Sequence, residues 1–119
     1  MLTLTGNGHL TRGVELCTTR TGKHTATVSI ASDRRDRQAG PLYVDLILWE
    51  GQAEAAAEHL VKGQAVAFAG RFEPRTYTDR DGREHVAYEA HDVMLEYGAK
   101  PRGLAALAAA NADKDHASA

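Results

Sequence analysis

Apolar and polar side chains alternate along much of the chain up to Tyr97, and this two-residue period predicts β-strands. The clearest strand is Tyr43 to Glu50, which places alternate residues on two faces. We expect the core to be met by Val44, Leu46 and Leu48. The other face carries Tyr43, Asp45, Ile47 and Trp49.

Two strands are predicted before this one. His24 to Ser32 sets Ala26, Val28 and Ile30 opposite a polar face of Thr25, Thr27 and Ser29. An opening strand around Leu2 and Leu4 is expected to end in a kink at Gly6-Asn7-Gly8 and to resume from Val14 to Cys17. Thr21-Gly22 is the turn between them, and Asp33 to Pro41 is a polar loop.

The pattern then changes to a helix and returns to strands. Gln52 to Val61 has helical composition, with Gly63 as a stop just past its end. Val66 to Phe72 reads as a strand in which Gly70 suits a tight bend. Asp81-Gly82 is the turn pair of a hairpin tip that spans Thr78 to Arg83, and His85 to Tyr97 is the last strand.

The composition changes near Gly98, so we expect one domain over residues 1–99 and a short flexible tail over residues 100–119. Within this tail Leu104 to Ala110 is predicted to form a helical turn or two, and Asn111 to Ala119 to be disordered. The order is three strands, a helix and two strands. This is the order of an all-β, five-stranded oligonucleotide/oligosaccharide-binding (OB) barrel with one α-helix between strands 3 and 4.

Composition constrains the function without defining it. The chain has 119 residues and a formal net charge of −2, so a nucleic-acid site has to come from local placement of bases. Between Arg12 and Arg37 there are six bases against three acids. A single cysteine, no signal peptide at the N-terminus and no membrane-length apolar run lead us to expect a cytoplasmic protein.

Candidate chemistry is limited. Cys17 is expected to be a small half-buried thiol, and neither it nor the six scattered histidines shows the spacing of a catalytic or metal site. We therefore expect no enzyme activity, no metal and no cofactor. Three aromatic residues remain as candidate functional residues: Tyr43, Trp49 and Tyr77. A lone tryptophan at a strand end, such as Trp49, is more often a core or subunit-interface residue than a platform for bases. Its phase with Tyr43, opposite the core face, favours a ring exposed for base stacking.

Several segments in the same order resemble the bacterial single-stranded DNA-binding protein (SSB) family, over about Met1 to Tyr97. The segments that carry the resemblance are Leu4-Thr5-Gly6-Asn7, Ile30-Ala31-Ser32, Tyr43 to Trp49, Glu54 to Gly63, and Val66 to Gly70 followed by Arg75 to Gly82. The resemblance implies sequence-tolerant binding of single-stranded DNA in replication, repair and recombination, usually as a homotetramer associated with the nucleoid.

The resemblance also implies roles for particular residues. Tyr43, Trp49 and Tyr77 fall on the family's base-stacking positions. The candidates for phosphate contact are Arg12, Arg20, Lys23, Arg34, Arg35, Arg37, Arg71 and Arg75. Asp45 on the same face is unfavourable for a polyanion, so we expect it either to pair with a nearby arginine or to mark a part of the face used otherwise.

Three departures from the family pattern qualify the resemblance. Thr11 to Glu15 lacks the family's Asp-Pro, the loop Asp33 to Gly40 holds arginines where relatives place a tryptophan, and the acidic, apolar-ended tail tip is missing. We therefore do not expect tail-mediated recruitment of repair proteins, and a specialised paralogue or a plasmid- or phage-encoded form fits the pattern. Two alternatives stay open: a primosome-type OB protein that acts mainly through protein contacts, and an enzyme or small-ligand OB module.

Overall fold

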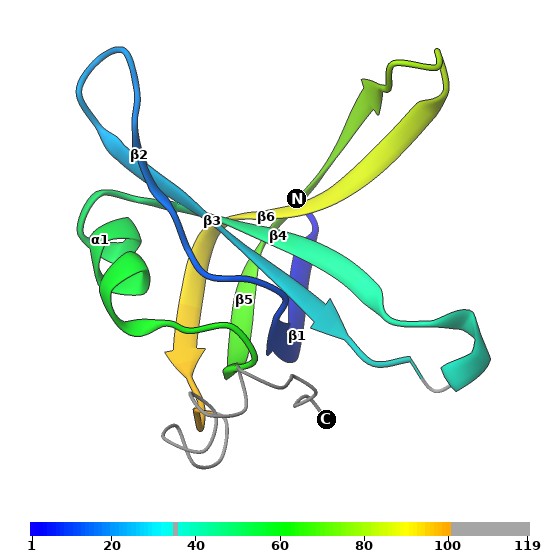
Figure 1. Cartoon of the computed structure of the whole chain (residues 1–119), viewed down its shortest axis with the longest axis horizontal. Coiled ribbons are helices and arrows are strands. Elements are labelled where there is room, and N and C mark those ends of the chain that lie inside the picture. Colours follow the sequence, from blue (N-terminus) through cyan, green and yellow to red (C-terminus); the bar gives the residue numbers. More distant parts are fainter. Residues whose placement is uncertain (35, 101–119) are drawn as a thin grey trace, which may run out of the picture.

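A computed structural model describes residues 1–34 and 36–100, which form one barrel of β-strands with a single α-helix (Figure 1). The strands are β1 (Thr3–Leu10), β2 (Leu16–Thr18), β3 (His24–Ser32), β4 (Leu42–Trp49), β5 (Ala65–Thr78) and β6 (Glu84–Tyr97). A short 3-10 helix, η1 (Arg37–Ala39), precedes β4, and α1 (Glu50–His59) follows it. The predicted tail segments lie outside the described residues.

The strands close into a ring. The sheet order is β1-β5-β6-β4-β3-β2, and an extra β1–β3 pairing joins the two sides, so that β1, β5, β6, β4 and β3 form a closed five-stranded barrel. β2 lies outside this ring and pairs only with β3 among the described strands. The predicted fold class, an OB barrel with a helix between the third and fourth barrel strands, is confirmed.

The predicted alternation in the two central strands is also confirmed. Val28, Ile30, Leu46 and Leu48 are fully buried, and Val44 joins them in the core. β3 and β4 pair antiparallel with Ile30 opposite Val44 and Ser29 opposite Asp45. Because residues directly opposite share a face, the polar residues of both strands lie together on the outer surface.

The first strand does not end at its glycines, as the sequence led us to expect. β1 continues through Gly6 and Gly8 to Leu10, and its register runs unbroken along β5. A Cβ on Gly8 would lie 2.5 Å from the carbonyl oxygen of Ala31, and one on Gly6 would touch the ring of Phe68. These glycines therefore allow close packing where the barrel closes, and they do not interrupt the strand.

The helix is displaced from its predicted range. α1 begins two residues earlier, because Trp49 is still extended while Glu50 turns sharply at a positive φ of 52°. Ala53 and Ala56 are fully buried, so the alanine-rich face packs on the barrel. The helix ends at His59 because Leu60 turns to an extended conformation and is itself buried. Gly63, predicted as the helix stop, has a φ of 86° in the turn that follows.

The last two strands are longer than the barrel needs. β5 runs to Thr78, beyond the predicted end at Phe72, and pairs with β6 to its tip, where Gly82 has the positive φ expected of the turn pair. The register shifts between Ala69 and Arg71, opposite Asp92 with a φ of 51°, so a β-bulge bends this hairpin. Gly70 lies at this bend, as predicted.

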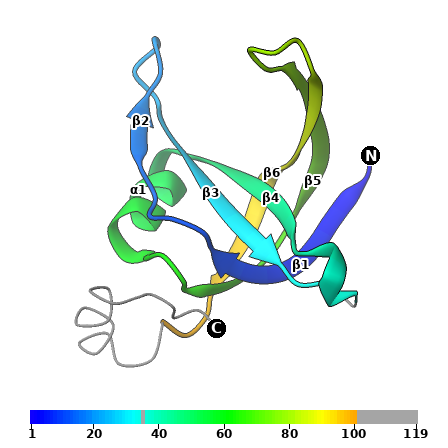
Figure 2. The same ribbon diagram turned by 45° about the vertical axis from the view of Figure 1, so that its right-hand side comes forward.

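Two hairpins rise on the same side of the barrel, as both ribbon views show (Figures 1 and 2). We call them the β2–β3 arm and the β5–β6 arm. They end in the turns around Gly22 and Gly82, respectively. Within residues 1–34 and 36–100, no helix is long and apolar enough to cross a membrane.

Candidate nucleic-acid interface

One outward surface of the barrel collects the residues that the sequence singled out. It is built from alternate residues of β3, β4, β6 and β5, and the strand register places them side by side. We call this surface the polar face. Its members are Thr25, Thr27, Ser29 and Ala31 on β3; Tyr43, Asp45, Ile47 and Trp49 on β4; Ala87, Glu89 and His91 on β6; and Arg71, Glu73, Arg75 and Tyr77 on β5.

The three predicted stacking residues all lie on the polar face with exposed rings. The exposed fraction is 62% for Tyr43, 45% for Trp49 and 43% for Tyr77. Tyr43 lies near the loop that joins β3 to β4, Trp49 lies at the base of the β2–β3 arm, and Tyr77 lies near the tip of the β5–β6 arm. The rings are therefore spread across the surface, with open rather than core-filling positions.

The ring of Tyr77 has close neighbours on its arm. The ring of His85 stacks on it at 5.3 Å between centroids and 22° between planes, and the guanidinium carbon of Arg75 lies 5.2 Å from the ring centroid. His85 Nε2 lies 2.6 Å from Asp79 Oδ2. This hydrogen bond is the main cause of the lowered pKa of Asp79, and hydrogen bonds from backbone N–H groups of the turn lower it further. The arm thus presents Tyr77 in a fixed, cation-flanked setting.

Both arginines on β5 are already paired with carboxylates. Arg71 binds Asp92 at 3.1 Å and also Glu73, and the hydrogen bond to Asp92 is the main cause of its raised pKa. Arg75 Nε donates to Glu89 Oε2 at 2.7 Å, and the pKa of Arg75 is likewise raised. A phosphate at either site would have to compete with a protein carboxylate.

Asp45 forms a hydrogen bond with the neighbouring strand. The Ser29 hydroxyl donates to Asp45 Oδ1 at 2.9 Å, and Arg12 donates to that same hydroxyl at 3.1 Å. Among the described side chains Asp45 forms no ion pair, and an arginine partner for it stays a prediction. The register explains the contact with Ser29, which lies directly opposite Asp45 on β3, whereas Arg75 lies farther away and experiences only its charge.

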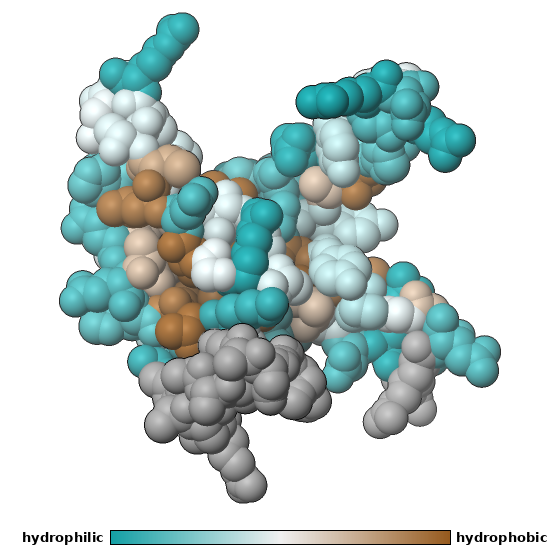
Figure 3. Space-filling view, in the orientation of Figure 1, coloured by the Kyte–Doolittle hydropathy of each residue, from teal (hydrophilic) through white to brown (hydrophobic). Residues whose placement is uncertain are grey.

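The other basic residues predicted to contact phosphate belong to the β2–β3 arm and to the segment that follows β3. Arg20 and Lys23 are exposed at the turn of the β2–β3 arm, and Arg34 is exposed in the loop after β3. Arg35 lies outside the described residues. Arg37 begins η1, and its side chain is outside the described part. Figure 3 shows both arms with largely hydrophilic tips and an open, concave surface between them.

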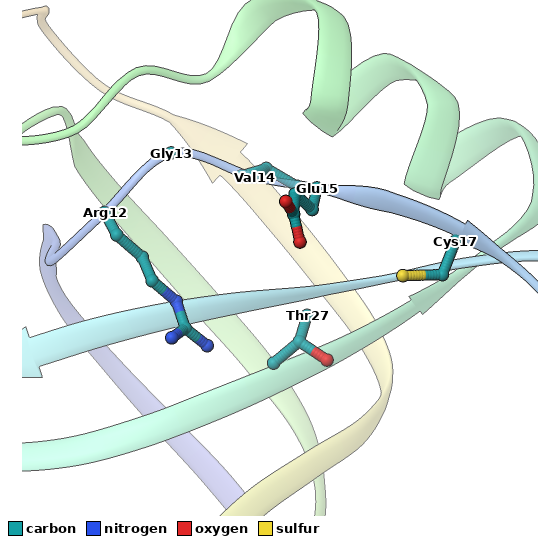
Figure 4. A pocket seen from close by; sticks show the side chains of 6 residues that line it. All are labelled: Arg12, Gly13, Val14, Glu15, Cys17 and Thr27. Carbon is teal, nitrogen blue, oxygen red and sulfur yellow. The ribbon is translucent and has the colours of Figure 1, made fainter.

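A shallow hollow adjoins the polar face between the β1–β2 connection and β3. It is lined by Arg12, Gly13, Val14, Glu15, Cys17 and Thr27, and the side chains of Arg12, Cys17 and Thr27 border the same space (Figure 4). Cys17 is exposed, so its prediction as a half-buried thiol was wrong. It lies on β2, whose three residues are all exposed because this strand lies outside the closed ring.

Sequence reasoning missed several members of the polar face. Glu73, Glu89 and His91 were not singled out, although Glu89 and His91 flank the buried Ala90 and so alternate with a core position. That alternation was the available signal. The β-bulge at Asp92 obscured it, because the phase of β6 changes there.

A closed OB barrel with an outward surface on its second and third barrel strands, β3 and β4, and with exposed rings on β4 and β5, has the architecture of OB modules that bind oligonucleotides or oligosaccharides on this surface. The chain matches the single-strand binding protein family over residues 2–95, and it belongs to that family.

Individual relatives agree with this assignment. The chain is 34% identical over 98 residues to single-stranded DNA-binding protein 3 of Clostridium acetobutylicum, covering 76% of this chain and 68% of the relative. It is 38% identical over 95 residues to single-stranded DNA-binding protein 1 of Tropheryma whipplei, covering 73% and 51%. It is 30% identical over 112 residues to the single-stranded DNA-binding protein of Halalkalibacterium halodurans, covering 89% and 65%.

Proposed function

We propose that the protein binds single-stranded DNA without reading a fixed sequence, and protects it during replication, repair or recombination. Family membership and the names of the relatives support this function. The observation that carries it is the set of exposed rings on the polar face, because a stacked base needs only a free aromatic surface. Tyr43, Trp49 and Tyr77 are the proposed stacking residues.

The proposed phosphate contacts divide into two groups. Arg12, Arg20, Lys23 and Arg34 lie along the β2–β3 side and the loop after β3, and Arg35 and Arg37 belong with them by sequence. Among the described residues, Arg12, Arg20, Lys23 and Arg34 form no ion pair. These four side chains can therefore bind a phosphate without first breaking a contact with a carboxylate. Arg71 and Arg75 form the second group and have to exchange Asp92, Glu73 or Glu89 for a phosphate.

This division predicts the salt dependence. Each phosphate neutralised on a single strand contributes a slope of about −0.7 to the plot of log affinity against log salt. The first group contributes fully. An arginine of the second group replaces one ion pair by another, so its net contribution is smaller. We therefore expect the slope of log affinity against log salt to be shallower than the value calculated from all eight basic side chains.

We also propose that the protein acts as a homo-oligomer, with a tetramer as the expected form. Large apolar side chains are exposed away from the polar face, among them Leu2, Met94 and Val86. Among the described strands, the edge of β1 that does not face β5 pairs with β3 only at His9 and Leu10, so its first residues offer free backbone groups. Light scattering on a sizing column measures this directly, and a monomer at micromolar concentration would refute it.

The protein is proposed to work in the cytoplasm, on the nucleoid, through residues 1–99 and by binding rather than catalysis. Tail-mediated recruitment through residues 100–119 is not part of the proposal. Family membership does not favour the primosome-type alternative or an enzyme or small-ligand module.

The direct test is a competition for a labelled single strand. The protein should bind a labelled single-stranded oligonucleotide. An excess of unlabelled single strand should displace the label, whereas unlabelled duplex of equal length should not. Retention of duplex as strongly as single strand would contradict the proposal. The absence of retention, with an intact fold by circular dichroism, would also refute it.

A further inference from the structure

Three carboxylates form a row across the middle of the polar face. Asp45 on β4 lies opposite Glu89 on β6, and Glu89 lies opposite Glu73 on β5. Ser29 on β3 extends the same row on the other side of Asp45. Like charges directly opposite each other destabilise a sheet, and a row of them repels a polyanion. A surface that served only to hold phosphates would not carry this row.

Two of the three carboxylates are occupied by cations. Glu89, whose side chain is only 12% exposed, accepts from Arg75 through Oε2 and lies 3.0 Å from His91 Nε2 through Oε1. Glu73 is bound by Arg71. Each of these two carboxylates is thus paired with an arginine of β5, and both oxygens of Glu89 have partners.

Asp45 is the exception in the row, because it has no cationic partner among the described side chains. Its Oδ1 accepts from Ser29, and no described side chain donates to its Oδ2. A carboxylate offers about four acceptor positions and no donor while ionised. Asp45 is therefore a half-exposed group with free capacity to accept hydrogen bonds, and only to accept them.

The position of Asp45 relates it to stacked bases. It lies two residues from Tyr43 and four from Trp49 on the same face of one strand, which places its Cα about 7 Å from the first and about 13 Å from the second. A base stacked on Tyr43 and turned along the strand brings its hydrogen-bonding edge to Asp45.

We propose that Asp45 discriminates between bases, favouring those with an exocyclic amino group over thymine. Cytosine offers its N4 amino group to a carboxylate, a pairing that also occurs where proteins read duplex DNA. Thymine presents carbonyl oxygens on both sides of a single N–H, and these oxygens meet the carboxylate with the same sign of charge. The inference rests on the proposed function and adds a compositional bias to otherwise sequence-tolerant binding.

Cytosine and thymine homopolymers of equal length test the proposal, because both bases are pyrimidines with similar stacking area. The measured quantity is the ratio of dC to dT affinity, at a slightly basic pH that keeps oligo-dC unfolded. Asp45→Asn keeps an oxygen to accept from Ser29 and removes the charge. We expect it to tighten dT more than dC and to lower the ratio by roughly fivefold, the low end of what one base contact supplies.

A second variant separates this reading from a general charge effect. Glu58→Gln removes one negative charge from an exposed position in the last turn of α1 and should leave the ratio unchanged. Equal ratios in wild type and Asp45→Asn, with both homopolymers bound, would overturn the inference while leaving the proposed function intact. A wild-type protein that bound neither homopolymer would refute the proposed function and the inference together.

Discussion

Replacement of Tyr77 by alanine tests the role of the β5–β6 arm. Stacking of one base on an aromatic side chain is worth about 1–3 kcal/mol. His85 and Arg75 already contact the Tyr77 ring, at 5.3 Å and 5.2 Å from its centroid, so part of its surface is not available to a base. We therefore expect the low end of the range, about 1 kcal/mol, or roughly a fivefold loss of affinity for an oligonucleotide that reaches the arm.

Tyr88→Ala is the matched control. Tyr88 is a tyrosine of nearly equal exposure, 41% against 43%, on the same arm, but its register position opposite Pro74 places it on the other face of the strands. Fluorescence anisotropy with a labelled oligonucleotide measures both variants, and thermal unfolding establishes that each is folded. Unchanged affinity in Tyr77→Ala, or an equal loss in Tyr88→Ala, would refute the assignment of the stacking surface to the Tyr77 side of the arm.

Three further predictions follow from the same contacts. Trp49→Ala should weaken binding by about 1–3 kcal/mol with the barrel still folded, and an unfolded variant by circular dichroism would instead make Trp49 a core residue. Gly8→Ala should lower the free energy of unfolding by about 2 kcal/mol in a urea titration, because the new Cβ meets the Ala31 carbonyl oxygen at 2.5 Å, whereas Gly13→Ala, with nothing within 4 Å, should be neutral. Burial works to raise the pKa of Glu89, but hydrogen bonds from Arg75 and His91 outweigh it and the pKa is lowered. The ionised Glu89 carboxylate therefore stabilises the fold above the ordinary glutamate pKa of about 4.3, and this stabilisation is lost as the pH falls below that value. Glu89→Gln should remove this contribution from the pH dependence of the free energy of unfolding.

The strands and the barrel order followed from the sequence where one physical effect dominated. β3 and β4 alternate strictly between apolar and polar residues because one face of each is buried, so Val28, Leu46 and Trp49 were placed on the correct faces. The turns at Gly22 and Gly82 could also be predicted from the sequence, because each turn requires a positive φ, which glycine adopts readily.

The errors arose where a long-range contact decided the local structure. Gly6 and Gly8 read as a kink from sequence, but their role is to let β1 pass close to Phe68 and Ala31, residues far away along the chain. The partner of Asp45 could not be predicted, because it depends on the register between β3 and β4. Glu89 and His91 on the polar face were missed because the bulge at Asp92 changes the phase of β6.

The most direct test of single-strand binding on the polar face is the fluorescence of Trp49, the sole tryptophan of the chain. The protein is titrated with a long oligo-dT at low and at high salt, with duplex DNA of equal length as the control. The account predicts saturable quenching by the single strand alone, which weakens as salt increases. No change in fluorescence, from a folded protein that also fails to retard the oligonucleotide on a gel, would contradict it.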